Sequence, residues 1–231
     1  MSLRALLLDF GGTLALERRS RASLYADAGR AHGVEVAETR MAELMGEAHD
    51  ALPQELNGAY RYSDAWFRSF IARVFQGGLS FQGDLEGLAR DLFAVFSDAR
   101  TFALFPDAAE LLARAARLRP AGLRVAVVSN WGPRLEPLLD GLLDGLGVRV
   151  DLALTSAQER LEKPDPALFQ RALERLGVEP EAALHVGDRV DTDVQGALAA
   201  GIRPVLLDRS GRMCAPPGVP VVCTLADVEL T

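Results

Sequence analysis

Between Pro106 and Asp208, short apolar runs alternate with longer segments of helical periodicity, and this alternation constrains the fold more than any other feature of the chain. Short uninterrupted apolar runs are typical of strands buried on both faces, and strands separated by helices form parallel sheets. We therefore expect strands over 124–128, 152–154, 183–186 and 204–207, and helices over 107–119, 133–146, 166–176 and 194–200. The sequence predicts an α/β protein with a Rossmann-like, doubly wound parallel sheet.

Two helix starts in this region carry capping residues. Asp165 stands before Pro166, an order that suits an N-cap followed by the first helical residue. Asp107 is expected to cap the helix that begins beside it.

The first strand is expected at the N-terminus, where Leu6, Leu7 and Leu8 precede Asp9. A carboxylate at the end of a buried strand contributes nothing to packing, and the two glycines that follow allow the backbone to approach a ligand closely. Asp9 is therefore the first candidate for a functional residue. The alternative is an aspartate that only closes a turn after a core strand.

Residues 16–99 differ from the rest because apolar residues recur there at helical spacing and no strand-like run interrupts them. Breaks near 53–58 and at 77–78 divide this stretch into about four helices. We expect an all-helical cap at 16–99, inserted after the first strand of a core domain made of 1–15 and 100–231. The aromatic residues Trp66, Phe67 and Phe70 are expected in the core of this cap.

Composition limits the function and the compartment. The 231 residues carry a formal net charge of −7, so we expect neither a nucleic-acid partner nor binding to an anionic membrane surface. Two cysteines, Cys214 and Cys223, cannot form a disulfide scaffold, and the N-terminal apolar run is too short for a signal peptide. We expect a cytoplasmic protein whose oligomeric state is open, a homodimer through the cap being one arrangement.

Polar side chains follow several of the expected strands. Because ligands bind beyond the carboxyl ends of parallel strands, one edge of the sheet should collect these residues: Asp9, Ser129, Asn130, Thr155, Ser156 and Asp188. Lys163 precedes a helix on the same side and is the one lysine among 25 basic residues. In a chain that otherwise uses arginine, a lysine at this position suggests a requirement for a compact charge.

These residues suit phosphoryl transfer. Asp9, Asp188 and Asp193 could gather around Mg²⁺, which prefers oxygen ligands and would relieve their mutual repulsion. Ser129, Asn130 and Lys163 could bind the oxygens of a phosphoryl group. An aspartate can then act as the nucleophile and form an aspartyl-phosphate.

The same residues, in the same order, resemble the four motifs of the haloacid dehalogenase-like hydrolase superfamily, in a member with a helical cap. The resemblance implies that Asp9 is the nucleophile and that Ser129 and Lys163 hold the phosphoryl oxygens. It further implies metal binding by Asp9, by the main-chain carbonyl of Gly11 and by Asp188, with Asp193 acting directly or through water. Asp191 could share this acidic site, whereas His185 is expected to be a packed core residue.

One position departs from the family pattern. Family phosphatases usually carry a second aspartate two residues after the nucleophile, which protonates the leaving oxygen, and this chain has Gly11 there. Positioned proton transfer is worth ~10²–10⁴ in rate. We therefore expect a Mg²⁺-dependent phosphatase acting on a small phosphorylated metabolite with a good leaving group, or one whose cap supplies a substitute acid such as Glu17.

Two other functions fit the sequence. A regulatory protein could keep the phosphate pocket and lose turnover. A 2-haloacid dehalogenase could use Asp9 to displace halide, because family dehalogenases also lack the second aspartate. The run of acidic residues from Gly187 to Asp193 favours a cation and so favours the phosphatase.

Overall fold

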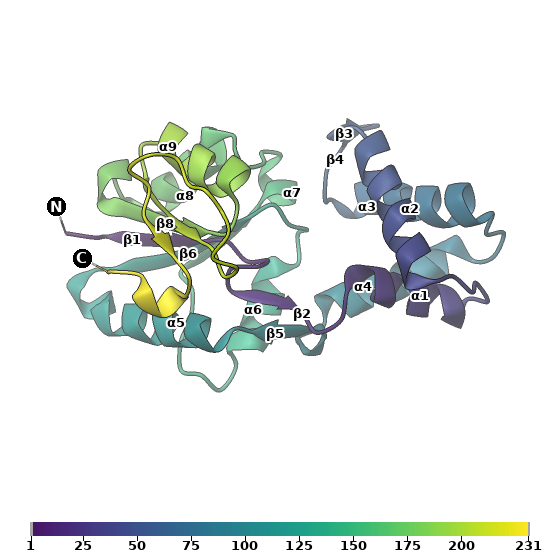
Figure 1. The fold of residues 1–231 in the computed structure, drawn as a ribbon, viewed down its shortest axis with the longest axis horizontal. Coiled ribbons are helices and arrows are strands. Elements are labelled where there is room, and N and C mark those ends of the chain that lie inside the picture. The colour runs from purple at the N-terminus through teal and green to yellow at the C-terminus, as the bar shows by residue number, and fades with distance from the viewer. Residues whose placement is uncertain (1, 231) are drawn as a thin grey trace.

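Figure 1 shows a computed structural model, which describes residues 2–230, with an α/β core that holds both ends of the chain and a cap beside it. In the described part of the chain, six parallel strands form the core sheet in the order β10-β9-β8-β1-β6-β7. The strands are β1 (Ala5–Leu8), β6 (Arg124–Ser129), β7 (Leu152–Thr155), β8 (Ala183–Gly187), β9 (Arg203–Leu207) and β10 (Val221–Val222). The expected parallel sheet is confirmed.

Helices cover both faces of this sheet, as its apolar strands require. Alternate residues of β1 divide between the faces: Leu6 and Leu8 pack toward α5 and α6, and Ala5 and Leu7 toward α8 and α9. The core helices are α5 (Pro106–Leu118), α6 (Leu135–Leu143), α7 (Ser156–Glu159), α8 (Pro166–Leu176) and α9 (Gln195–Ala199). Short 3-10 turns lie at Ala99–Thr101, Arg119–Ala121, Pro180–Ala182 and Leu225–Asp227, and a π-helical turn spans Val190–Val194.

Strand register brings the polar strand ends together. Leu8 pairs with Val127 of β6 on one side and with Val186 of β8 on the other. Asp9 therefore leaves the central strand between the ends of two neighbours. This register aligns the carboxyl ends of β1, β6 and β8. The polar residues that follow these strands therefore meet at one edge of the sheet, as the sequence predicted.

The cap has its own hydrophobic core, built from α1 (Arg21–Ala31), α2 (Glu38–Ala51), α3 (Asp64–Ala72), the π-helical turn Arg73–Gly78 and α4 (Leu85–Ser97). Trp66 and Phe70 are buried in it as expected, and their rings stack with centroids 5.7 Å apart. Two strands, β2 (Ala15–Glu17) and β5 (Phe102–Leu104), pair antiparallel where the chain passes between core and cap.

The cap is not entirely helical, and the expectation of an all-helical insertion was wrong at one place. Strands β3 (Glu55–Leu56) and β4 (Ala59–Tyr60) form a small hairpin. Its turn consists of Asn57 and Gly58, both with positive φ. An Asn-Gly pair is the strongest short hairpin signal because both residues tolerate this conformation. The short flanking strands left no period-2 pattern to support it.

Asp165 caps α8 through the backbone N–H of Ala167, as expected. Asp107, in contrast, does not cap α5, whose N-cap is Phe105. The Asp107 carboxylate instead accepts hydrogen bonds from Arg209, the Thr224 hydroxyl and the Leu225 N–H. The Asp107 side chain therefore bonds to residues distant in sequence and not to the start of α5, where the local pattern predicted a cap.

None of the helices within residues 2–230 is both long enough and apolar enough to cross a membrane.

Candidate active site

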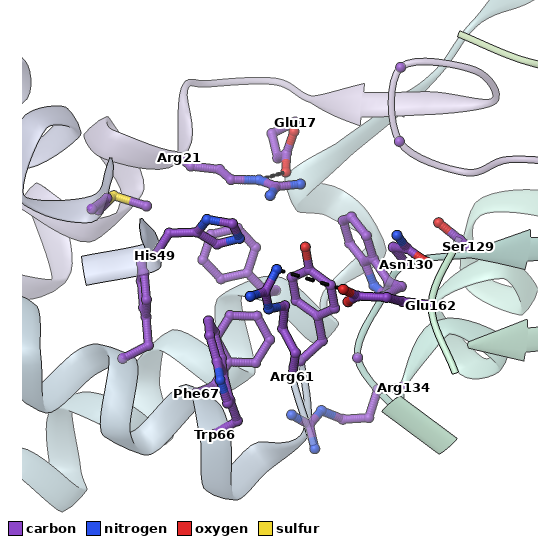
Figure 2. Close-up of a pocket in the computed structure, with 18 of the residues that line it drawn as sticks. Glu17, Arg21, His49, Arg61, Trp66, Phe67, Ser129, Asn130, Arg134 and Glu162 are labelled. Atoms are coloured by element: carbon purple, nitrogen blue, oxygen red, sulfur yellow. Dashed lines mark hydrogen bonds and ion pairs between the residues drawn. The ribbon is translucent and has the colours of Figure 1, made fainter. Parts of the chain in front are cut away.

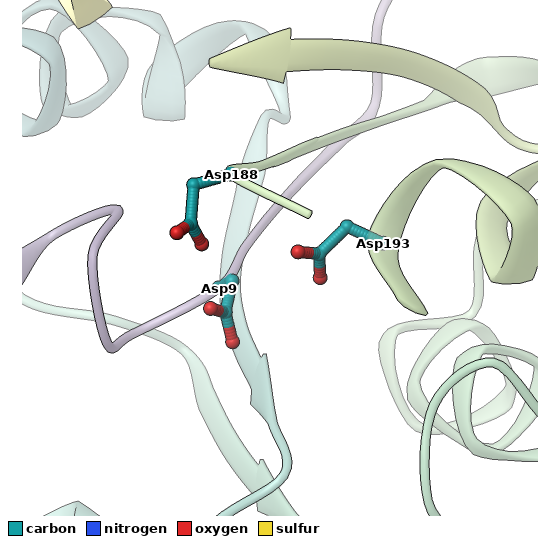
Figure 3. Close-up of side chains that lie close together, drawn as sticks. All are labelled: Asp9, Asp188 and Asp193. Carbon is teal, nitrogen blue, oxygen red and sulfur yellow. The ribbon is translucent and has the colours of Figure 1, made fainter. Parts of the chain in front are cut away.

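Three carboxylates converge at the carboxyl edge of the sheet (Figure 3). Asp9 follows β1, Asp188 follows β8, and Asp193 lies in the π-helical turn after it. One oxygen from each lies within 4.8 Å of the others. Asp9 and Asp193 are buried, so this negative charge is held largely out of water.

Lys163 binds two of these carboxylates. Its Nζ donates to Asp9 Oδ1 at 2.7 Å and to Asp193 Oδ1 at 2.5 Å. Burial alone would lower the pKa of Lys163, but the charges of Asp193 and Asp9 raise the pKa above its usual value. The single lysine of the chain is therefore a buried ammonium directly beside the candidate nucleophile.

Residues of the core domain hydrogen-bond to both carboxylate oxygens of Asp193. His185 Nε2 lies 3.1 Å from Asp193 Oδ1, and the Arg189 N–H donates to Oδ2 at 3.0 Å. Burial would raise the pKa of Asp193, but the charge of Lys163 and the hydrogen bond from His185 hold that pKa far below its usual range. His185 is fully buried and its ring packs edge-on against Phe169, so it is a core residue that also fixes a site carboxylate.

Asp188 carries the charge that Lys163 does not balance. Burial and the nearby charges of Asp9 and Asp193 raise the pKa of Asp188 to about 6. Thr13 Oγ1 donates to it at 3.3 Å. Gly12 allows this approach, since it has φ +80° and a Cβ there would lie 2.5 Å from the Asp188 carboxylate.

The site fits a hard cation. Three carboxylates share one ammonium, which leaves an excess of negative charge on oxygen ligands of the kind Mg²⁺ prefers. Gly187 keeps the cluster compact, because a Cβ at that position would come within 2.2 Å of Asp193.

Ser129 ends strand β6 on the other side of Asp9, and Asn130 follows it. Ser129 lines the pocket and is 3% exposed. The Asn130 amide is committed to the main chain of Lys163: Nδ2 donates to the Lys163 carbonyl at 3.0 Å, and the Lys163 N–H donates to Oδ1 at 2.8 Å. Asn130 therefore positions the loop that carries the lysine.

Gly11 faces Trp131. A Cβ built on Gly11 would lie 3.6 Å from the Trp131 ring, an ordinary van der Waals contact, so the backbone there would accept a side chain. Trp131 packs edge-on against Phe10 and carries the Arg21 guanidinium over its face, 5.2 Å from the ring centroid. The Ser156 hydroxyl accepts a hydrogen bond from the main-chain N–H of Trp131. The Trp131 ring therefore borders the space beside Gly11.

A cavity of about 940 Å³ lies between this edge and the cap. Figure 2 shows its cap side, where Trp66, Phe67 and His49 face the core, and where Glu17 accepts from Arg21. Trp66 is thus a buried core residue of the cap that also lines the cavity, whereas Phe67, also expected in the core, is only partly buried. Arg61 reaches from the cap toward Glu162, the residue before Lys163.

The structure therefore brings Asp9, Asp188, Asp193, Ser129 and Lys163 together, as predicted from the sequence. The catalytic and binding roles of these residues stay predictions. Thr155 instead caps α7, and Asp191 pairs with Arg189 in solvent. Arg18 and Arg19 border a separate shallow depression, whereas Arg21 reaches the cavity.

Sequence reasoning missed Trp131, Arg61 and Glu162 as lining residues. Trp131 and Glu162 adjoin the strand-end motifs and could have been found by extending them by one residue. Arg61 follows the unrecognised hairpin and carried no signal.

A buried aspartate, an ammonium and an acidic cluster thus lie together beneath a cap. A family model described as haloacid dehalogenase-like hydrolase matches residues 3–201. The chain belongs to this family.

Relatives with different names share its sequence or its fold. Haloacid dehalogenase-like hydrolase domain-containing protein 3 of Bos taurus is 34% identical over 212 residues, 90% of this chain and 82% of that protein. A phosphoserine phosphatase of Thermus thermophilus is 36% identical over 242 residues, 94% of each chain. The crystal structure of a 2-haloacid dehalogenase from Pseudomonas syringae superposes with a TM-score of 0.67 at 21% identity, covering 97% of this chain and 95% of that one, which shows the shared fold.

Proposed function

We propose that the protein is a Mg²⁺-dependent phosphatase that acts through an aspartyl-phosphate at Asp9 on a small phosphorylated metabolite. The observation that carries the proposal is the cluster of Asp9, Asp188 and Asp193 around one lysine. Displacement of halide by a carboxylate needs no cation, so a dehalogenase reaction would not account for the excess negative charge of this cluster. The Thermus thermophilus relative, named a phosphoserine phosphatase, supports the reaction class.

In the proposed reaction, an oxygen of Asp9 attacks the phosphorus atom and forms the aspartyl-phosphate as the bond to the leaving oxygen breaks. The leaving group takes the electron pair of that bond. Water then attacks the phosphorus, releasing phosphate and restoring the Asp9 carboxylate, and the proton of the water passes to phosphate or solvent. Lys163 and Ser129 are proposed to bind the phosphoryl oxygens while this happens.

Asp9, Asp188 and Asp193, with the Gly11 carbonyl, are the proposed holders of Mg²⁺. When bound, Mg²⁺ supplies charge that offsets the repulsion between the phosphoryl group and the carboxylates. The raised pKa of Asp188 reflects the excess negative charge of the three carboxylates. A bound cation would balance this charge.

Gly11 limits the leaving group. Trp131 beside it has no acidic proton to offer an alkoxide, so an aryl or acyl phosphate, whose leaving group departs as a stable anion, is the proposed kind of substrate. The aromatic walls of the cavity are compatible with an aryl group.

The test is phosphate release from 4-nitrophenyl phosphate with and without Mg²⁺, for the unchanged chain and for Asp9→Asn. We expect Mg²⁺-dependent release that falls by at least ~10³-fold in the variant, because the nucleophile is lost. Saturable phosphate binding without release would indicate a binding protein. Halide release from a 2-haloacid, independent of Mg²⁺ and abolished in Asp9→Asn, would identify a dehalogenase.

A further inference from the structure

An ion pair that lines the cavity joins the cap to the core beside the reactive edge. Arg61 follows β4 of the cap, and Glu162 directly precedes Lys163. Arg61 Nη1 lies 3.7 Å from Glu162 Oε1, beyond hydrogen-bonding distance, although both side chains are about four-fifths buried at 21% and 18% exposure (Figure 2).

Both members of this pair keep a buried polar atom without a partner. Within residues 2–230, three buried side-chain atoms lack a hydrogen bond: Arg61 Nε, Glu162 Oε2 and His185 Nδ1. Two of the three belong to this pair. A buried polar group without a partner costs about 1–3 kcal/mol, so the two unpartnered atoms of this pair require an explanation.

Other charged residues of the cavity do not share this feature. Arg134 makes two hydrogen bonds of 2.8 Å to Asp64, and Lys163 holds Asp9 and Asp193 at 2.7 and 2.5 Å. Among the cavity-lining residues within 2–230, only Arg61 and Glu162 keep a buried side-chain atom without a hydrogen-bond partner.

The chemistry of the pair specifies what could complete it. A ligand group must accept a hydrogen bond from Arg61 Nε and donate one to Glu162 Oε2. Because the pair is neutral overall, a simple anion attracted by Arg61 would be repelled by Glu162, and a simple cation would meet the reverse. A carboxylate and an ammonium on neighbouring atoms satisfy both residues and keep the site neutral.

We infer that Arg61 and Glu162 recognise the amino and carboxylate groups of a free amino acid that carries the phosphoryl group on its side chain. This inference rests on the proposed phosphatase function. Glu162 adjoins Lys163 in sequence and all three residues line the cavity, so the pair lies beside the proposed phosphoryl site. O-phospho-L-tyrosine is the chosen probe, because it combines the amino-acid end with an aryl leaving group.

The competing account is a latch, in which the pair only holds the cap against the core. The chain offers a matched control. Arg160 of the core donates to the Gly58 carbonyl at 2.9 Å and pairs with Glu55 of the cap at 2.9 Å, and neither side chain lines the cavity. Glu55→Gln and Arg160→Met therefore loosen the cap without altering the recognition pair.

The experiment compares kcat/KM for O-phospho-L-tyrosine with kcat/KM for N-acetyl-O-phospho-L-tyrosine amide, which has the same leaving group and no charge at the amino-acid end. We expect the unchanged protein to prefer the free amino acid by ~10-fold or more, as two charge-assisted contacts predict. In Arg61→Met and in Glu162→Gln the preference should fall to within ~2-fold, and it should persist in Glu55→Gln and Arg160→Met.

Two results would overturn the inference and leave the phosphatase function intact: equal hydrolysis of both compounds by the unchanged protein, or loss of preference in the two latch controls as well. If neither compound nor 4-nitrophenyl phosphate is hydrolysed, the phosphatase function itself fails. Calorimetric binding of the two phosphotyrosine compounds to the unchanged chain and to Asp9→Asn then decides the inference. Tighter binding of the free amino acid, lost in Arg61→Met, supports it, and equal binding rejects it.

Discussion

The two walls of the cavity differ in how completely their charges are paired. At the edge of the sheet, Lys163, Asp9 and Asp193 are hydrogen-bonded and buried, with His185 and Asn130 behind them. At the boundary with the cap, Arg61 and Glu162 are 3.7 Å apart and each keeps an unpaired buried atom. The hydrogen-bonded residues of the first wall are organised before a substrate arrives, as electrostatic catalysis requires, although Asp188 keeps a charge that Lys163 does not balance. The second wall is, by our inference, complete only with a ligand.

This contrast predicts a division of effects. Substitutions at the sheet edge should lower turnover of every substrate, because they remove groups that we propose act on the phosphoryl centre. Substitutions at the cap should change which substrates are preferred, because the cap residues would contact only the leaving group, which differs from one substrate to the next.

The largest effect is expected for Lys163→Met. Loss of the ammonium leaves Asp9 and Asp193 without their counter-charge, so kcat/KM should fall by ~10³-fold or more for all phosphorylated substrates. The variant should also unfold more easily, by about 3–5 kcal/mol, as removal of one member of a buried ion pair does. Steady-state kinetics at a temperature where circular dichroism shows folded protein measures the first effect, and urea unfolding measures the second.

Lys163→Arg is the control variant that keeps the positive charge and changes the shape of the charged group. A planar guanidinium cannot replace a compact ammonium that bridges two carboxylates, so activity should stay low while stability partly recovers. Turnover within ~10-fold of the unchanged protein in Lys163→Met would show that the sheet edge does not act as described.

The second prediction restores the missing acid. Gly11→Asp should raise kcat/KM on alkyl phosphates by ~10² or more, since a positioned proton donor assists an alkoxide leaving group, and should change aryl phosphate turnover little. The new Cβ would meet only ordinary contact with Trp131. Rates on glycerol phosphate and 4-nitrophenyl phosphate measure the difference.

Gly12→Asp is the matched control for that experiment. Gly12 has φ +80°, and its Cβ would lie 2.5 Å from Asp188, so this variant should lose activity on both substrates. An unchanged alkyl phosphate rate in Gly11→Asp would mean that the leaving group is not limited by proton transfer.

The third prediction concerns the support of the nucleophile loop. Arg209 donates to the carbonyls of Gly12 and Thr13 and is held by Asp107. Burial opposes ionisation of Asp107, but hydrogen bonds from Arg209, Leu225 and Thr224 lower its pKa to about 2, against 3.8 ordinarily. The folded state therefore binds this proton less readily than the unfolded state. The resulting stability, about 2 kcal/mol, is present above pH ~4 and is lost as the pH falls toward 2.

Asp107→Asn isolates this contribution. The difference in unfolding free energy between the unchanged protein and the variant should shrink by about 2 kcal/mol between pH ~4.5 and pH ~2. Urea unfolding at several pH values measures it. A difference that does not depend on pH would mean that ionised Asp107 does not stabilise the fold.

The sequence predicted the sheet edge better than the cap, for a physical reason. A parallel sheet maps strand ends onto one edge by topology alone, so Asp9, Ser129 and Asp188 could be placed together without any knowledge of side-chain packing. Arg61 and Glu162 meet because the cap lies against the core, each with its own hydrophobic cluster, and no local pattern encodes that contact. The bonds of Asn130 and Asp107 were missed for a related reason, since each side chain pairs across a long separation in sequence.

The smallest effect is expected from the cap aromatics. Phe67 is partly buried and lines the cavity beside Trp66, so Phe67→Leu removes aromatic contact with an aryl group and keeps most of the apolar volume. KM for an aryl phosphate should rise by ~3- to 10-fold with kcat nearly unchanged, as loss of an aromatic contact worth about 0.5–1.5 kcal/mol predicts. Steady-state kinetics with 4-nitrophenyl phosphate and with acetyl phosphate checks it, the acyl compound being the control that lacks a ring. A fall in kcat for both substrates would instead place Phe67 with the residues that organise the reacting edge, and the division between the two walls would not hold.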